Sequence, residues 1–174
     1  MIYFIELFLM EEIILDDIDL RLLAELQRDA SRSNQALAEA LRVSPATSLR
    51  RTRRLVELGV IERQVALLQP ERVAAALGHG LTALVEVSLD RQGAEHLDAF
   101  EARAVADAAV QQCWRVSPGP DFVLVVAVRD MPGYQALAQR LFSQDANVRN
   151  VRAFFSLKRA KFEPALPLPD RFAR

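Results

Sequence analysis

The chain has 174 residues, of which 51% are hydrophobic and 26% are charged, and its formal net charge is −1. These values are typical of a folded globular protein with one large or two small domains, and they exclude a globally basic protein. Cys113 is the single cysteine, which excludes a disulfide framework and favours a reducing, cytoplasmic location. The chain has only two histidines, far apart in the sequence, so we expect no metal and no cofactor.

The first ten residues, MIYFIELFLM, form an apolar run that contains Glu6. The run is too short to span a bilayer, and it has neither the positive region nor the small-residue cleavage site of a signal peptide. We therefore expect residues 1–14 to be an N-terminal extension without an assigned function, and we expect no membrane association. Translation from Met10 is an alternative explanation of this segment.

Two helices are predicted between residues 15 and 41. Asp16 or Asp17 can cap the first helix, whose apolar residues recur at spacings of three and four. The second, shorter helix covers roughly residues 34–41. The dipeptide Arg42-Val43 forms the turn that follows it.

A third helix is predicted to begin at Ser44 and Pro45. The serine can cap the helix, and proline is harmless at a first helical position, where its missing N–H has no partner to lose. Gly59 ends the helix, and alternation of polar and apolar residues over 60–68 predicts a short β wing.

The third helix carries four arginines and no acid before Glu57. At about 100° per residue, one face is apolar enough to dock on the other helices and the opposite face is basic. The predicted docking face consists of Leu49, Thr52, Leu55 and Val56. The predicted outward face consists of Arg50, Arg53 and Arg54, with Arg51 at its flank.

A solvated surface without a partner is the alternative for an isolated arginine-rich helix. The helix-turn-helix spacing, the lack of balancing acids and the following wing favour DNA instead, because such a motif presents the N-terminal part of its second helix to the major groove. Arginine pairs bidentately with guanine and with phosphate. The predicted DNA-binding residues are Ser44, Thr47, Ser48, Arg50, Arg51, Arg53 and Arg54.

The second half changes to strand periodicity. Its predicted elements are strand 81–89, helix 94–106, strand 110–117, a nearly continuous apolar strand 122–129, a helix from Asp130 to Phe142 and strand 148–157. The order βαββαβ is the ferredoxin-like unit. The predicted fold class is therefore α+β, an N-terminal winged helix-turn-helix joined to a C-terminal ferredoxin-like βαββαβ domain.

Aromatic residues of these strands are predicted to lie in the core or in a dimer interface more readily than in a ligand cage. Phe154 and Phe155 are adjacent and must point to opposite faces, which indicates a sheet covered by helices on one side and by a partner subunit on the other. Trp114 and Phe122 belong to the same group. Cys113 is predicted to be an inert packing residue.

From about Leu15 to Glu163 the chain resembles the Lrp/AsnC family of leucine-responsive, feast/famine regulators. The stretch LDDIDLRLLAELQRDASRSNQALAEALRVSPATSLRRTRRLVELGVIERQVALLQP resembles the family's DNA-binding domain, and the element order of the second half resembles its effector-binding domain. The resemblance implies a regulator, not an enzyme, that binds double-stranded DNA. It also implies a homodimer formed by packing sheet on sheet, further assembly into tetramers or octamers, and an amino-acid effector bound between dimers.

The predicted domains follow from this resemblance and from the pattern. They are the N-terminal extension (1–14), the winged helix-turn-helix DNA-binding domain (15–70), a linker with a short helix and a boundary at His79 (71–80), the ferredoxin-like effector-binding and oligomerisation domain (81–160) and a proline-rich C-terminal tail (161–174).

The resemblance places effector contacts at the turn between the second and third strands and near it. The positions that match are Arg115, Ser117, Gly119, Asp121, Met131, Phe154, Phe155 and Ser156. This chain departs from the family in that turn, because Pro118 and Pro120 replace a glycine and an aromatic residue, and proline removes an N–H that could hold a ligand carboxylate. It also departs at Arg115, where an apolar residue is usual, and at Arg42, where glycine is usual.

Two alternatives stay open. The altered turn keeps a ligand-independent architectural DNA binder open as an alternative to the effector-responsive regulator that the resemblance implies. Sirohaem decarboxylases share the two-domain plan, but the second-domain strands contain no histidine, and no nucleophile–base set, phosphate-binding glycine loop or metal spacing is present in the sequence.

Overall fold

A computed structural model describes residues 13–77 and 80–169, and the chain divides into two compact units. The helical unit comprises Met1–Ala66 with Phe162–Arg174, and the sheet unit comprises Leu67–Lys161. Most of the predicted N-terminal extension and the predicted boundary at His79 lie outside the described residues. None of the described helices has the length and apolar character needed to cross a membrane.

The helical unit contains α2 (Asp17–Arg28), α3 (Asn34–Leu41) and α4 (Pro45–Glu57), which confirms the three predicted helices. A capping box starts α2: the Asp16 carboxylate accepts from the backbone N–H groups of Ile18 and Asp19, and Asp19 accepts from the Asp16 N–H. The core is small. The buried apolar residues that form it are Leu22, Leu37, Leu41 and Leu55.

The turn between α3 and α4 contains a left-handed residue at Arg42, the position where glycine is usual in the family that the chain resembles. Arg42 has φ 56° and ψ 46°, and the Val43 N–H donates to the Ala38 carbonyl across it. A side chain in this region costs about 1 kcal/mol relative to glycine, which a packed turn tolerates.

The predicted β wing is wrong as a strand. Residues 62–69 form no strand, and Val65 and Leu67 are exposed. An extended segment without a neighbouring strand has no partner for its backbone N–H and C=O groups, so alternation alone does not produce a strand. The predicted linker helix is present as α5 (Pro70–Leu77).

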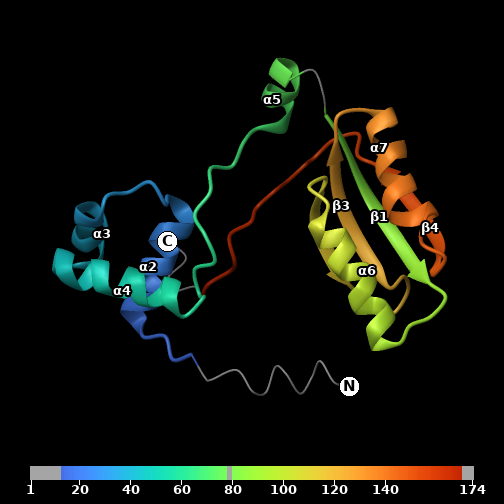
Figure 1. Cartoon of the computed structure of the whole chain (residues 1–174). Helices are drawn as coiled ribbons and strands as arrows, with labels where there is room; N and C mark the ends of the chain where they lie inside the picture. Colours follow the sequence, from blue (N-terminus) through green and yellow to red (C-terminus); the bar gives the residue numbers. More distant parts are fainter. Residues whose placement is uncertain (1–12, 78–79, 170–174) are drawn as a thin grey trace. The chain divides into compact units, whose positions relative to one another are not determined.

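The sheet unit has the predicted βαββαβ order, shown in Figure 1. Its elements are β1 (Leu81–Leu89), α6 (Ala94–Ala106), β2 (Val110–Arg115), β3 (Phe122–Val128), α7 (Met131–Ala138), the π-helical turn η1 (Gln139–Ser143) and β4 (Val148–Phe155). The four strands pair antiparallel in the order β2-β3-β1-β4, which confirms the ferredoxin-like fold.

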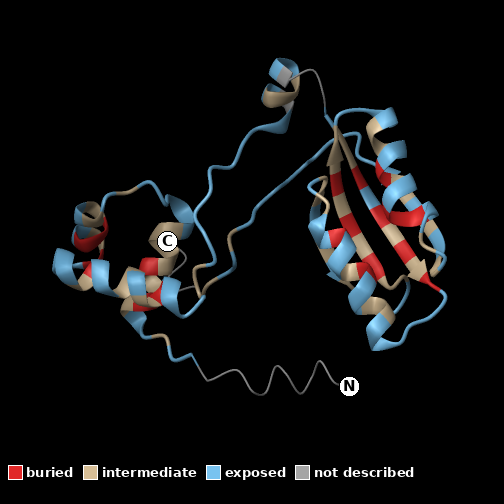
Figure 2. Cartoon of the chain, in the orientation of Figure 1, coloured by how far each residue is buried: buried red, intermediate tan, exposed pale blue. Residues whose placement is uncertain are grey.

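The helices α6 and α7 cover one face of this sheet. Val85 and Leu124 pair across β1 and β3 on that face, where they are buried together with Phe100 of α6 and Leu137 of α7. Buried residues alternate with less buried ones along β1 and β3 in Figure 2. The other face of the sheet, formed by the alternate residues, is covered by no helix among the described residues of the sheet unit.

The two adjacent phenylalanines point to opposite faces, as predicted. Phe155 packs its ring edge-on against Tyr134 of α7, with ring centroids 5.0 Å apart. Phe154 is exposed on the open face, where the Arg152 guanidinium lies over its ring. The sheet therefore has one face closed by helices and one apolar face left open.

Candidate nucleic-acid interface

The start of α4 is held by hydroxyl and amide groups. The Ser44 side chain accepts from the Thr47 backbone N–H at 3.2 Å, and its hydroxyl lies 2.9 Å from that of Thr47. The Asn34 side-chain amide donates to the Pro45 carbonyl at 2.9 Å, which ties the first turn of α3 to the first turn of α4. The first turn of α4 is therefore fixed against α3.

The side of α4 that docks on the helical unit differs from the predicted side. Leu55 is buried and Thr52 is half-buried, as predicted, but Leu49 is 41% exposed and Val56 is 51% exposed. Ser48 is fully buried in their place. The prediction that Leu49 and Val56 dock is wrong, because it chose the docking side by apolar content alone.

The burial of Ser48 also corrects its predicted role. A side chain with no exposed surface cannot reach a base or a phosphate, so Ser48 does not belong to an outward surface. Its hydroxyl oxygen has no hydrogen-bond partner among the described residues. Ser48 is a packing residue of the helix contact.

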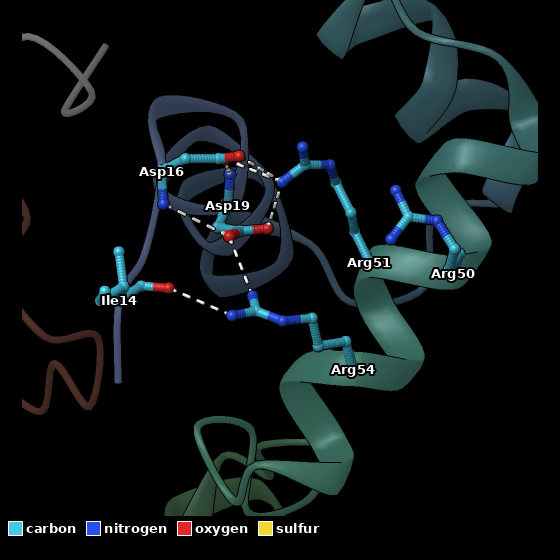
Figure 3. Close-up of a pocket in the computed structure, with 6 residues that line it drawn as sticks. All are labelled: Ile14, Asp16, Asp19, Arg50, Arg51 and Arg54. Atoms are coloured by element: carbon cyan, nitrogen blue, oxygen red, sulfur yellow. Dashed lines mark hydrogen bonds and ion pairs between the residues drawn. The ribbon is translucent and has the colours of Figure 1, made fainter. Parts of the chain in front are cut away.

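An ion-pair network explains why α4 docks in this orientation. Arg51 donates through Nη1 to Asp16 Oδ2 and to Asp19 Oδ1, each at 2.7 Å. Arg54 donates to Asp19 Oδ2 at 3.1 Å and to the Ile14 carbonyl at 3.2 Å. Figure 3 shows the two arginines converging on these carboxylates from successive turns of α4.

The electrostatics of the network bind its members tightly. The Asp19 side chain is 2% exposed, and a carboxylate so deeply buried requires cations beside it. The hydrogen bond from the Asp19 N–H, opposed by desolvation and reinforced by Arg51, keeps the pKa of Asp16 below its ordinary value. Asp19 and then Asp16 raise the pKa of the Arg51 guanidinium.

The network corrects the predicted orientation of Arg51 and gives Arg54 an anchor within the helical unit. Arg51 points inward and is anchored to α2, and Arg54 is anchored to the same carboxylate while staying partly exposed. Asp19, the anchor of both arginines, is not among the residues predicted from the sequence. The signal was available, since Asp19 is an acid in the first turn of a helix, directly after Ile18 in the apolar stripe.

Arg50 and Arg53 occupy the outward side of α4. Both are exposed, and neither makes an ion pair or side-chain hydrogen bond within residues 13–77 and 80–169. In Figure 3, Arg50 stands outside the dashed network. Helical periodicity places Ala46 and Leu49 on the same side, so the outward surface combines two cations with small and apolar side chains.

The predicted effector residues form two groups within one chain. Arg115 ends β2 at one edge of the sheet, and the turn of Ser117, Gly119 and Asp121 follows it. The second group lies at the opposite edge and the far end of β3, and consists of Met131, Phe154, Phe155 and Ser156. A single chain therefore does not bring all the predicted positions into one site.

Two members of the first group already have protein partners. The Asp121 carboxylate accepts from the buried Leu89 backbone N–H at 2.7 Å. Arg115 donates to Asp98 at 2.7 Å and to Glu101 at 2.6 Å, both on α6. These contacts show structural roles that the sequence analysis did not assign to either residue.

Cys113 lies next to this group on β2. The residue is half-buried against the sheet core, and burial raises the pKa of its thiol, with the Glu101 charge adding to the effect. A raised pKa keeps the thiol protonated and unreactive. This agrees with the predicted packing role.

Two family models match the chain. Residues 15–62 match the one described as winged helix-turn-helix DNA-binding, and residues 82–166 match the Lrp/AsnC ligand binding domain. The Leucine-responsive regulatory protein of Rhizobium meliloti (strain 1021) is 36% identical over 147 residues, which cover 84% of this chain and 92% of that protein. This chain belongs to the Lrp/AsnC family.

Further relatives align along nearly their whole length. The DNA-binding transcriptional activator DecR of Escherichia coli (strain K12) is 33% identical over 154 residues, covering 88% of this chain and 99% of that protein. Among solved structures, an AsnC family transcriptional regulator from Agrobacterium tumefaciens superposes with a TM-score of 0.77 at 29% identity, covering 88% of this chain and 97% of the other.

A second solved relative contains a ligand. It is a transcriptional regulator from Neisseria meningitidis in complex with L-Met, with a TM-score of 0.77, 28% identity and coverage of 88% of this chain and 97% of that one. The fold, the matched domains and the named relatives together make this Lrp/AsnC protein a DNA-binding transcriptional regulator with a ligand-binding domain.

Proposed function

We propose that this regulator contacts duplex DNA with the outward side of α4, and that Arg50 and Arg53 are its principal contacts. One observation carries the proposal: Arg51 and Arg54 are engaged by the buried Asp19, while Arg50 and Arg53 stay exposed and without such a partner among the described residues, on one side of the same helix. The four arginines thus divide into a positioning pair and a contacting pair.

The chemistry of that side suits a major groove. An arginine can pair bidentately with guanine or bond to phosphate, and the exposed Leu49 can contact a thymine methyl group. Ala46 is small enough for the helix to approach base edges. The exposed Ser44 lies at the N-terminus of α4, where the positive end of the helix dipole favours a phosphate.

The test is a charge-matched pair of double variants. Arg50→Ala with Arg53→Ala should lower affinity for operator DNA by at least about tenfold and reduce the salt dependence by roughly one unit of slope per lost phosphate contact. The control replaces Arg91 and Arg149, which are exposed on the sheet unit, and removes the same charge. Fluorescence anisotropy at several salt concentrations measures both.

Equal losses in the two double variants would contradict the assignment, because only net charge would then matter. Lysine at positions 50 and 53 sharpens the result. Lysine keeps the charge but not the planar fork, so it should restore the salt dependence while leaving discrimination between operator and random DNA reduced.

We propose further that a second copy of the chain covers the open face of the sheet. Trp114 of β2 is 58% exposed there, and Leu84 of β1 and Phe154 of β4 are exposed on the same face. Trp114 pairs with Val123, and Val125 pairs with Leu84, which pairs with Phe154, so all four strands present apolar residues on this face, with the Glu86–Arg152 ion pair among them. Packing of two such faces is the dimer that the family resemblance implies.

A charge on this face tests the proposal. Trp114→Glu should shift the oligomer to a smaller species in sedimentation velocity, because the interface would have to bury an unpaired carboxylate. Gln135→Glu, on an exposed part of α7, is the control with the same added charge. An unchanged oligomer in the Trp114 variant would place the interface elsewhere.

An amino acid is the effector that we propose. Its support is the match to the ligand-binding domain and the relative solved with L-Met. The exposed residues of the first group, Ser117 and Gly119, remain the predicted contacts, with the second group supplied by another subunit. Calorimetric titration with L-Met and the other nineteen amino acids tests this; twenty flat titrations would favour the ligand-independent architectural role.

A further inference from the structure

The C-terminal tail belongs to the helical unit although it follows the last strand of the sheet unit. Gln27, in the last turn of α2, makes two hydrogen bonds to the backbone of Leu166. Its Nε2 donates to the Leu166 carbonyl at 3.1 Å, and its Oε1 accepts from the Leu166 N–H at 2.6 Å. A side-chain amide that pairs with both backbone groups of one residue specifies the position of an extended segment.

The burial of residues on α2 and in the tail indicates that the tail is docked on this helix. On α2, Leu20 and Ala24 share the face of Gln27 by their spacing and are half-buried, although neither packs in the described core cluster around Leu22. The tail contributes its own half-buried pair three residues apart, and the spacing matches one turn of a polyproline II helix. These residues are Ala165 and Leu168.

The composition of the tail suits this mode of binding. Pro164 and Pro167 restrict the backbone before docking, so ordering the segment costs less conformational entropy. The Leu166 side chain is 73% exposed, so at this position the tail contacts α2 through its backbone. Its half-buried side chains, Ala165 and Leu168, lie on either side of Leu166 in the sequence.

We propose that residues 162–169 form a strap that docks across α2, with Ala165 and Leu168 against Leu20 and Ala24 and with Gln27 holding the Leu166 backbone. The partner of this α2 surface is therefore a segment of the same polypeptide.

The strap has a consequence for the reach of the helical unit. The last sheet hydrogen bond of β4 runs from the Ser156 N–H to the Thr82 carbonyl. Ten residue steps from Ser156 to Leu166 span at most about 36 Å. The other connection, from Ile61 to Leu81, spans up to about 55 Å with α5 folded. A docked strap is thus the shorter tether, and it limits how far the DNA-binding unit can move from the sheet.

The docking itself is tested without DNA. Hydrogen–deuterium exchange of the full-length protein should show protection of the tail, and Gln27→Ala should raise the exchange rate of the Leu166 amide at least tenfold. Gln35→Ala, which removes an exposed glutamine from α3 in the same unit, should leave it unchanged. An unprotected tail in the parent protein, or equal exchange in the two variants, overturns the docking.

The tether is tested with a matched pair at one position. Leu166→Pro removes the N–H that Gln27 accepts, whereas Leu166→Ala keeps it and alters only an exposed side chain. The binding assay uses a series of operators that differ in the spacing of their half-sites. The proline variant should bind over a wider range of spacings, with an affinity at least fivefold higher than that of the parent protein at the least favoured spacing. The alanine variant should keep the parent profile.

The two levels of the inference can fail separately. The tether is overturned if hydrogen exchange shows that the strap is released in the proline variant and both variants still have the same profile of operator affinity against half-site spacing. The tether rests on the proposed DNA-binding function; a protein that binds no duplex would remove that function and the tether together, while hydrogen exchange would still decide the docking.

Discussion

The two units of this regulator are stabilised in different ways. The described core of the sheet unit consists of twelve buried apolar residues, packed between a four-stranded sheet and two helices. The described core of the helical unit has four, and the unit also buries the polar residues Asp19 and Ser48. A small unit buries a smaller fraction of its apolar surface, so polar contacts contribute a larger share of its stability. An arginine on α4 can therefore serve the fold as much as the function.

The largest expected effect is in the helical unit. Asp19→Ala should destabilise it by about 2–4 kcal/mol, because the change removes the charge-assisted hydrogen bonds from Arg51 and Arg54 and the capping bond from the Asp16 N–H, although Asp16 still pairs with Arg51. Hydrogen exchange of α2 and α4 during urea unfolding measures this loss. Glu57→Ala removes an exposed acid from the same unit and serves as control. A stability loss below 1 kcal/mol would mean that the network contributes little.

The corresponding change in the sheet unit should have a smaller effect. Asp121→Ala leaves the buried Leu89 N–H without its acceptor, which costs about 1–3 kcal/mol. Trp114, the single tryptophan, reports unfolding of this unit by fluorescence. Asp90→Ala, at an exposed position next to Leu89, should be near neutral. A fully stable Asp121 variant that loses an amino-acid response would return this residue to the effector site.

Acid should weaken the helical unit through Asp16. Its pKa is lowered in the folded state, so its stabilising contribution is complete above the unfolded pKa of about 3.9 and is lost as the pH falls through the lower folded value. Unfolding followed between pH 5 and pH 2 should show this loss for α2. The Asp16→Asn variant keeps a capping oxygen and should show a flatter dependence; an identical pH profile would contradict the assignment to Asp16.

The smallest effect is expected at Ser48. Its buried hydroxyl has no described partner, so Ser48→Ala should change the stability of the helical unit by less than about 0.5 kcal/mol. Operator affinity should stay unchanged, because the side chain lies inside. Thermal unfolding and anisotropy measure the two quantities. A marked loss of affinity would return Ser48 to the outward surface and contradict the orientation of α4.

Elements of strong periodicity were predictable along the chain. The apolar strand 122–128 and the alternation over 81–89 specified two strands, and the capping residues Asp16, Ser44 and Asp130 marked the starts of helices that the structure contains. The strand predicted over residues 60–68 is absent, although its alternation of polar and apolar residues was equally clear. A strand needs a hydrogen-bonded neighbour, and a pattern within one segment carries no information about that neighbour.

The amino-acid sequence alone determined the class of fold, the order of elements and the presence of an arginine-rich helix after a helix-turn-helix turn, because these depend on spacing between near neighbours. Tertiary structure decided which arginines face outward. Asp19 is more than thirty residues from Arg51 and Arg54 in the chain, and its burial beside them rotates Leu49 outward and Ser48 inward. A buried charge must be neutralised by groups close to it in space, and that requirement overrides the apolar pattern of a single helix.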